Sequence, residues 1–168
     1  GEQAITETWN GTNWTEVGDL NEARSSLGGA GINTAALAFG GNPSPKLKLT
    51  ESWNGSNWTA VNPMINSRID FAGFGATNTA AIAAGGSEVS PQAKTESWNG
   101  SSWTEVNDLN TARKRLVGAG TSTAGIVFGG DPPGTAALTE LWNGTNWTEV
   151  SDLATPREAP GGAGTTAA

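Results

Sequence analysis

Large apolar and short polar positions alternate along much of the chain with a period of two, which is typical of β-strands. Residues 47–53 show this alternation clearly, and residues 5–9 repeat it. Asn-Gly follows Trp9 directly and favours a hairpin, because both residue types tolerate positive φ. A four-residue loop over 10–13 would place Trp9 opposite Trp14, whereas a two-residue turn would shift that register.

The hairpin phrase recurs four times, and it contains all eight tryptophans. Their pairs begin 44, 45 and 44 residues apart, at Trp9/Trp14, Trp53/Trp58, Trp98/Trp103 and Trp142/Trp147. Two further elements recur in step: a Gly-rich run that follows an arginine, and an apolar run that ends in Gly-Gly. Each period therefore predicts four short antiparallel strands, which describes a propeller blade better than a solenoid coil. Glycine suits the first strand because innermost strands crowd around the axis.

Three recurring elements resemble kelch repeats. They are the double glycine that closes the second strand, the Trp-Asn pair in the third, and the tryptophan that opens the fourth: Gly40-Gly41, Gly85-Gly86 and Gly129-Gly130; Trp53-Asn54 and its copies; Trp14, Trp58, Trp103 and Trp147. The near-identical repeats also resemble kelch-type arrays of marine bacteriophage and marine bacterial surface proteins. The resemblance implies an all-β fold of kelch-type β-propeller blades, each with four antiparallel strands, about four in this chain with one incomplete.

We expect residues 1–168 to form a single kelch-like propeller or part of one. The repeat units are roughly 1–24, 25–68, 69–113 and 114–157, with a partial strand over 158–168. These units supply three complete blades, two strands at the front and one at the back. Three arrangements stay open: a fragment of a larger ring, a four-blade ring with a shortened closing blade, or a subunit whose gap another chain fills. A piece of a longer array is favoured, and the incomplete blade predicts self-association through its uncovered strand edge.

Composition removes many functional classes. The chain has no Cys, His or Tyr, so thiolate zinc sites, Ser-His-Asp arrangements and the copper chemistry of one kelch branch are absent. The net charge of −7 opposes nucleic acid as a partner, and no apolar run reaches the roughly 20 residues of a membrane span. We therefore expect no enzyme activity, no cofactor, no metal site and no membrane insertion. A carboxylate-based hydrolase is disfavoured because its two acids must differ in environment, whereas these acids mostly recur blade by blade.

The recurring Trp, Glu and Arg side chains are expected to be structural. The tryptophans would form the core between blades rather than an exposed sugar-stacking platform, because the chain has few other large apolar groups. A glutamate lies two residues before the first Trp of each pair, and an arginine follows that glutamate by 17 residues. A carboxylate on an apolar face needs a partner, so we expect one structural ion pair per blade. These residues are Glu7, Glu51, Glu96 and Glu140, and Arg24, Arg68, Arg113 and Arg157.

The loops after each Gly-Gly differ most between repeats, and variable loops on a fixed scaffold can carry distinct contacts. They can also diverge simply because nothing constrains them. The candidate partner-binding residues in these loops are Asn42, Ser44, Lys46, Ser87, Glu88 and Asp131. We expect a binding or adhesion module on a cell or virion surface that contacts an unidentified protein or glycan through the loop-rich face. The alternative is a structural assembly element, associated with a virion or its tail, that packs against other copies.

Overall fold

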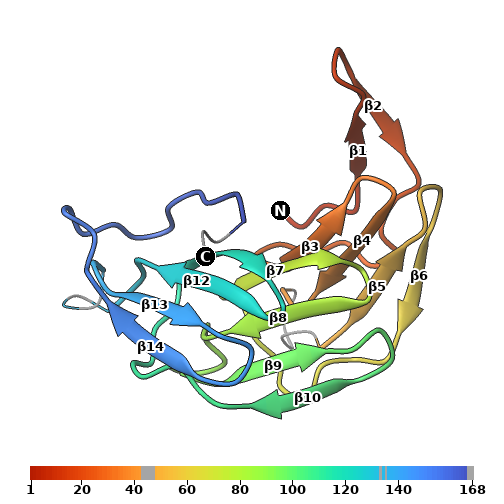
Figure 1. Ribbon diagram of the computed structural model, residues 1–168. Helices are drawn as coiled ribbons and strands as arrows, with labels where there is room; N and C mark the ends of the chain where they lie inside the picture. Colours follow the sequence, from red (N-terminus) through yellow and green to blue (C-terminus); the bar gives the residue numbers. More distant parts are fainter. Residues whose placement is uncertain (43–47, 133, 135, 166–168) are drawn as a thin grey trace.

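The computed structural model describes residues 1–42, 48–132, 134 and 136–165, and within these ranges it contains 14 β-strands and no helix (Figure 1). The strands form three antiparallel four-stranded sheets and one separate two-stranded hairpin. The all-β class and the four-stranded, blade-like units predicted from the sequence are confirmed. The described ranges hold no helix that could cross a membrane.

Each sheet uses its four strands in sequence order. The hairpin consists of β1 (Thr6–Trp9) and β2 (Trp14–Val17). The first blade consists of β3 (Gly28–Ile32), β4 (Ala35–Phe39), β5 (Thr50–Trp53) and β6 (Trp58–Val61). The second blade consists of β7 (Ala72–Thr77), β8 (Ala80–Ala84), β9 (Thr95–Trp98) and β10 (Trp103–Val106). The last blade consists of β11 (Val117–Thr121), β12 (Ala124–Phe128), β13 (Thr139–Trp142) and β14 (Trp147–Val150).

The Asn-Gly loop has four residues, which decides the register that the sequence left open. Trp9 lies directly opposite Trp14, and Asn10 Oδ1 accepts hydrogen bonds of 2.9 Å from the backbone N–H groups of Thr12 and Asn13. Gly11 has a φ of +96°, in the left-handed region that favours glycine. The same register recurs in all three blades, and the paired indole rings lie 5.1 to 5.6 Å apart.

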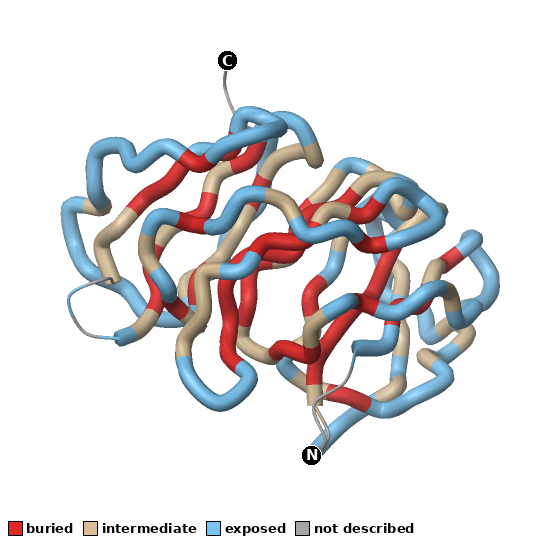
Figure 2. Tube along the Cα trace, turned by 90° about the horizontal axis from the view of Figure 1, so that it is seen from below, coloured by how far each residue is buried: buried red, intermediate tan, exposed pale blue. Residues whose placement is uncertain are grey.

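The Gly-rich strands lie innermost, because β7 packs between β3 and β11. A Cβ on Gly73 would lie 2.9 Å from the Cα of Gly28 in the neighbouring blade, so this approach of two backbones requires glycine. Burial is greatest where strands of adjacent blades meet, while the loops at both ends are exposed (Figure 2).

The core consists of one apolar cluster in each seam between neighbouring blades. In the first seam the ring of Phe39 lies 4.9 Å from that of Trp103. In the second seam Ala84 occupies the position equivalent to Phe39, and Phe74 approaches Trp147 at 6.4 Å instead. Both seams are therefore filled by a large aromatic residue, which lies on β4 in the first seam and on β7 in the second.

The β1–β2 hairpin and the segment after β14 lie outside the three blades. The β1–β2 hairpin has no strand partner outside itself, and no strand is found over residues 158–165 where the sequence predicts one; residues 166–168 of that prediction lie outside the described residues. Gly162 nevertheless packs on Val117 and Phe128 of the last blade, as Gly73 packs on Gly28 and Phe39. The segment follows the path of a first strand without pairing, because no second strand lies beside it to supply hydrogen bonds.

Candidate functional site

Six connections between strands gather at one end of the blades, and we call this end the loop face. They are the β2–β3, β4–β5, β6–β7, β8–β9, β10–β11 and β12–β13 connections. Paired backbone hydrogen bonds join them at three equivalent places: Ser25 with Asn42, Ile69 with Ser87, and Lys114 with Asp131. The Asn-Gly loops lie at the opposite end, where Trp53 Nε1 donates to the Asn33 carbonyl at 3.0 Å.

The predicted partner-binding residues occupy different environments on the loop face. Glu88 is exposed, and its carboxylate accepts a 2.7 Å hydrogen bond from Ser67 Oγ. Asp131 lies 3.4 Å from the ammonium of Lys114. Ser87 is only 7% exposed, so its side chain has little surface to offer a partner. Asn42 is half-buried, while Ser44 and Lys46 lie outside the described residues.

Sequence reasoning missed four equivalent residues near the axis of the loop face. Each of them has a φ between 44° and 55°, although none is glycine: Ser26, Asp70, Arg115 and Ala159. The backbone N–H of each of the last three donates to the carbonyl of the equivalent residue one blade earlier, at 3.4, 2.6 and 2.9 Å. The detectable signal was their place two residues after each recurring arginine, where the side chain differs in every copy.

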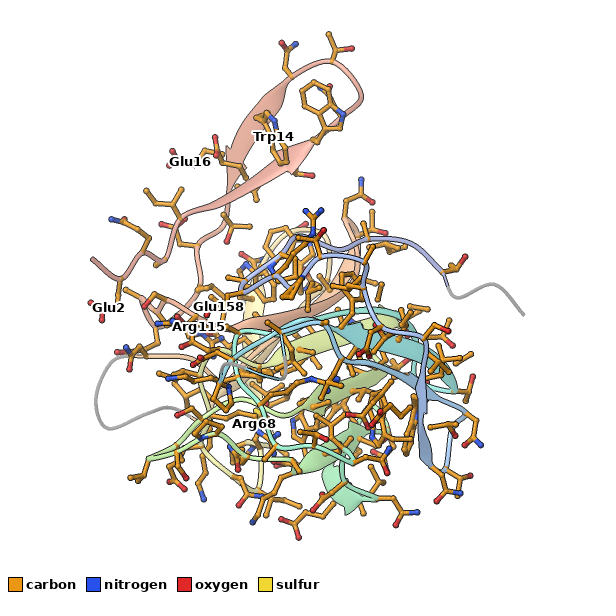
Figure 3. All side chains as sticks on the ribbon, turned by 90° about the vertical axis from the view of Figure 1, so that its left-hand side faces the viewer. Glu2, Trp14, Glu16, Arg68, Arg115 and Glu158 are labelled. Carbon is orange, nitrogen blue, oxygen red and sulfur yellow. The ribbon has the colours of Figure 1, made fainter. Side chains whose placement is uncertain are left out.

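Charged side chains surround this axial region. Arg115 Nε lies 4.0 Å from Asp70 Oδ2, and Arg115 Nη1 lies 3.7 Å from Glu158 Oε2. Figure 3 shows Arg115 and Glu158 together beside the body of the blades. A shallow hollow of about 200 Å³ opens here between residues of all three blades and the C-terminal segment. The arrangement presents one cation between two acids, which suits a polar partner surface.

A second charged group lies at the rim of the loop face. Glu105 accepts a 2.7 Å hydrogen bond from Asn66 Nδ2 and lies 3.4 Å from Lys94 Nζ. The hydrogen bond from Asn66, followed by the charge of Lys94, lowers the pKa of the Glu105 carboxyl below its ordinary value.

The ion pairs are buried, but they do not follow the 17-residue spacing that the sequence suggested. The pairs are Arg24–Glu51 at 2.8 Å, Arg68–Glu96 at 2.5 Å and Arg113–Glu140 at 3.0 Å. In each, the arginine lies just before the first strand of a blade and reaches the third strand of that same blade. The 17-residue spacing instead relates a glutamate to the arginine of the following blade. Among the described residues Glu7 and Arg157 form no such pair, and both are exposed.

Each buried glutamate also receives backbone hydrogen bonds from the segment ahead of its blade. The N–H groups of Asn21, Ile65 and Asn110 donate to Glu51, Glu96 and Glu140, each at 2.8 Å. Burial lowers the pKa of all three arginines, against the attraction of the paired carboxylate. These carboxylates are held by fixed donors, so they tie the connection to the sheet.

No protein-family model matches the chain, and no curated protein matches it. Among the described residues, no group of three or more Asp and Glu side chains is arranged to hold a metal ion.

The burial of the tryptophans depends on their position along the chain. Five are buried, namely Trp53, Trp98, Trp103, Trp142 and Trp147. In both seams, and also where the first blade meets the hairpin, the fourth-strand tryptophan donates its Nε1 proton to a threonine of the preceding unit. The pairs are Trp58–Thr6 at 3.0 Å, Trp103–Thr50 at 2.9 Å and Trp147–Thr95 at 3.2 Å. In the hairpin, however, Trp9 is 45% and Trp14 is 64% exposed.

Proposed function

We propose that this chain is a non-enzymatic binding module that contacts a protein or glycan through its loop face, as part of a kelch-like propeller on a cell or virion surface. The kelch-like repeat elements and the absence of histidine and cysteine support this proposal. The recurring acids support it as well, because three of the four are enclosed by an arginine and backbone amides.

The observation that carries the proposal is the contrast between a uniform scaffold and a varied axial position. Arginine and glutamate recur in every blade, yet the residue two places after the arginine is Ser26, Asp70, Arg115 or Ala159. These residues share one backbone conformation and one backbone hydrogen-bonding pattern. Because the fold does not require a particular side chain there, their differences are available for recognition.

The opposite end of the blades offers a partner little that is distinctive. Its four Asn-Gly loops share the sequence Trp-Asn-Gly and the same Asn-centred hydrogen bonds. A partner that bound the Asn-Gly loops would meet the same surface in every blade. Such a surface favours avidity from several identical contacts over one specific contact.

Screening the 168-residue chain against a glycan array and an array of purified surface proteins tests the proposal. We expect a saturable hit whose affinity falls about tenfold or more in Arg115→Glu and Glu88→Lys, because contacts by charged groups set orientation and specificity. Ser56→Ala, in an Asn-Gly loop at the opposite end, is the matched control and should bind like the wild type. Thermal unfolding of each variant verifies that the fold is retained.

Two results would overturn this function. One is the absence of any hit in both arrays. The other is a hit that Ser56→Ala weakens while Arg115→Glu and Glu88→Lys leave it unchanged, since that would place the contact on the Asn-Gly loops.

A structural assembly element is the second candidate function, and the exposed hairpin favours it. Trp9 and Trp14 offer large apolar surface on a two-stranded unit that pairs with no other described strand, and such surfaces commonly mark association sites. The mass of the protein in solution tests this candidate separately from the binding screen.

A further inference from the structure

We infer that copies of this chain associate head to tail, with the β1–β2 hairpin of one copy docking on the last blade of a second copy. The inference deepens the assembly function proposed above and does not depend on the loop-face function. It rests on the Trp–Thr hydrogen bonds and Arg–Glu ion pairs that recur along the chain. It also rests on the equivalent residues that make no such contact among the described residues.

The first left-over pair is Trp14 and Thr139. Four equivalent tryptophans and four equivalent threonines occur, and three Nε1-to-Oγ1 hydrogen bonds use Trp58, Trp103 and Trp147 with Thr6, Thr50 and Thr95. The Thr6 hydroxyl donates to the Ala4 carbonyl at 3.5 Å while it accepts from Trp58. The Thr139 hydroxyl makes the same donation to the Ala137 carbonyl, Thr139 is 5% exposed, and among the described residues no tryptophan donates to its oxygen.

The last blade also has a hollow in which that tryptophan could pack. In the first seam Trp103 packs in one cluster with Phe39 and Met64. At the outer surface of the last blade, Phe128 and Leu153 hold the equivalent positions and line a hollow of about 470 Å³. Phe128 lies opposite Thr139 in the sheet, as Phe39 lies opposite Thr50. An indole from another molecule would therefore meet the counterparts of Phe39 and Met64, which Trp103 contacts within the chain.

The second left-over pair is Glu7 and Arg157. In each complete blade the arginine before the first strand pairs with the glutamate of the third strand. Arg157 lies before the C-terminal segment and lines the same hollow, while Glu7 lies in β1, the counterpart of a third strand. A docked hairpin would bring Glu7 of one copy to Arg157 of the other, and the opposite charges favour this direction of docking.

One side of the hairpin contacts the first blade through the Trp58–Thr6 hydrogen bond, while Trp9 and Trp14 are exposed to a second molecule. Figure 3 shows it projecting away from the blades, with Trp14 and Glu16 far from Glu158 of the C-terminal segment. Figure 1 shows the same separation between β1–β2 and the C-terminal segment. Donor and acceptor surfaces are different patches, so the contact is heterologous and builds chains or closed rings rather than a two-fold dimer.

Analytical ultracentrifugation of mixed variants tests this arrangement. Trp14→Ala removes the donor and Phe128→Ala weakens the acceptor, with Thr139→Val as a second acceptor variant of nearly unchanged shape. The wild type should exceed the 17.1 kDa chain mass increasingly as concentration rises, and each variant alone should remain at 17.1 kDa. An equimolar mixture of Trp14→Ala with either acceptor variant should stop at twice that mass, because one intact interface remains per pair. Val89→Ala, which alters an exposed apolar residue of the loop face, should behave as the wild type.

A charge exchange separates specific docking from apolar aggregation. Glu7→Arg and Arg157→Glu should each prevent association, and the double variant should restore it. The inference is overturned if the wild type stays monomeric at every concentration, as it would if the hairpin closed on its own last blade. It is also overturned if Trp14→Ala associates like the wild type, or if the mixture of folded donor and acceptor variants stays monomeric. None of these results bears on the glycan and protein arrays, so the two functions fail independently.

Discussion

Arg68 and Glu96 form an ion pair in which both side chains are fully buried, with Arg68 Nη2 donating to Glu96 Oε1 at 2.5 Å. Arg68 Nη1 also donates to the carbonyl groups of Gly85 and Lys94, at 3.0 and 2.7 Å. One guanidinium thus connects the segment ahead of a blade to the ends of its second and third strands. This contact makes each blade dependent on the connection that precedes it.

Removing that guanidinium should be strongly destabilising. We expect Arg68→Ala to lower the free energy of unfolding by about 3 to 5 kcal/mol, because it leaves the Glu96 carboxylate buried without its counter-charge. Lys48→Ala removes an exposed lysine and should cost well under about 1 kcal/mol. Urea denaturation followed by tryptophan fluorescence measures both changes, and equal losses would show that the buried pair has no special role.

The indole N–H in a formed seam can be tested against the same group in the exposed hairpin. Trp103→Phe should cost about 1 to 3 kcal/mol of unfolding free energy, because the N–H that reaches Thr50 is lost in a buried seam. Trp14→Phe changes the equivalent residue where it is 64% exposed and should cost less than about 0.5 kcal/mol in dilute protein. Chemical denaturation at low protein concentration compares them, and similar costs would contradict the seam contact.

Two glycines of the inner strands should respond differently to one added methyl group. Gly73→Ala places a Cβ 2.9 Å from the Cα of Gly28, so the blades must separate, at a cost of about 1 to 3 kcal/mol. At Gly29 the nearest atom to such a Cβ is the Leu37 carbonyl oxygen at 3.8 Å, and Gly29→Ala should change stability by no more than about 0.5 kcal/mol. Thermal unfolding distinguishes them; a neutral Gly73→Ala would argue against close backbone packing around the axis.

The lowered pKa of Glu105 predicts a small pH dependence of stability. A carboxyl whose pKa is lower in the folded state stabilises the protein above its unfolded pKa, and this contribution is lost as pH falls through the folded pKa. The melting temperatures of wild type and Glu105→Gln should therefore differ at neutral pH and converge in acid. Glu149→Gln is the matched control, because Leu138 stands there in place of Lys94. A difference that persists at low pH would assign the effect to packing rather than charge.

The sequence by itself determined the repeating unit. Alternation and Asn-Gly turns are local signals, so they located the four strands of each blade and the hairpin register up to the choice of loop length. The Trp pairs and Gly-rich runs also marked which strands face the seams and the axis. Of the strand expected over 158–168, the described part 158–165 did not form, because a strand requires a partner and no described strand lies beside it.

The tertiary structure alone decided which repeated residues meet. Arg24 has one recurring glutamate 17 residues before it and another 27 residues after it, and only the folding of each connection back onto its own blade selects Glu51 over Glu7. The exchange of Phe39 for Phe74 between seams depends on volumes summed over two blades, which no local pattern records. The placement of whole blades also decides that Trp14 is exposed, whereas Trp58, Trp103 and Trp147 each donate to a threonine of the preceding unit.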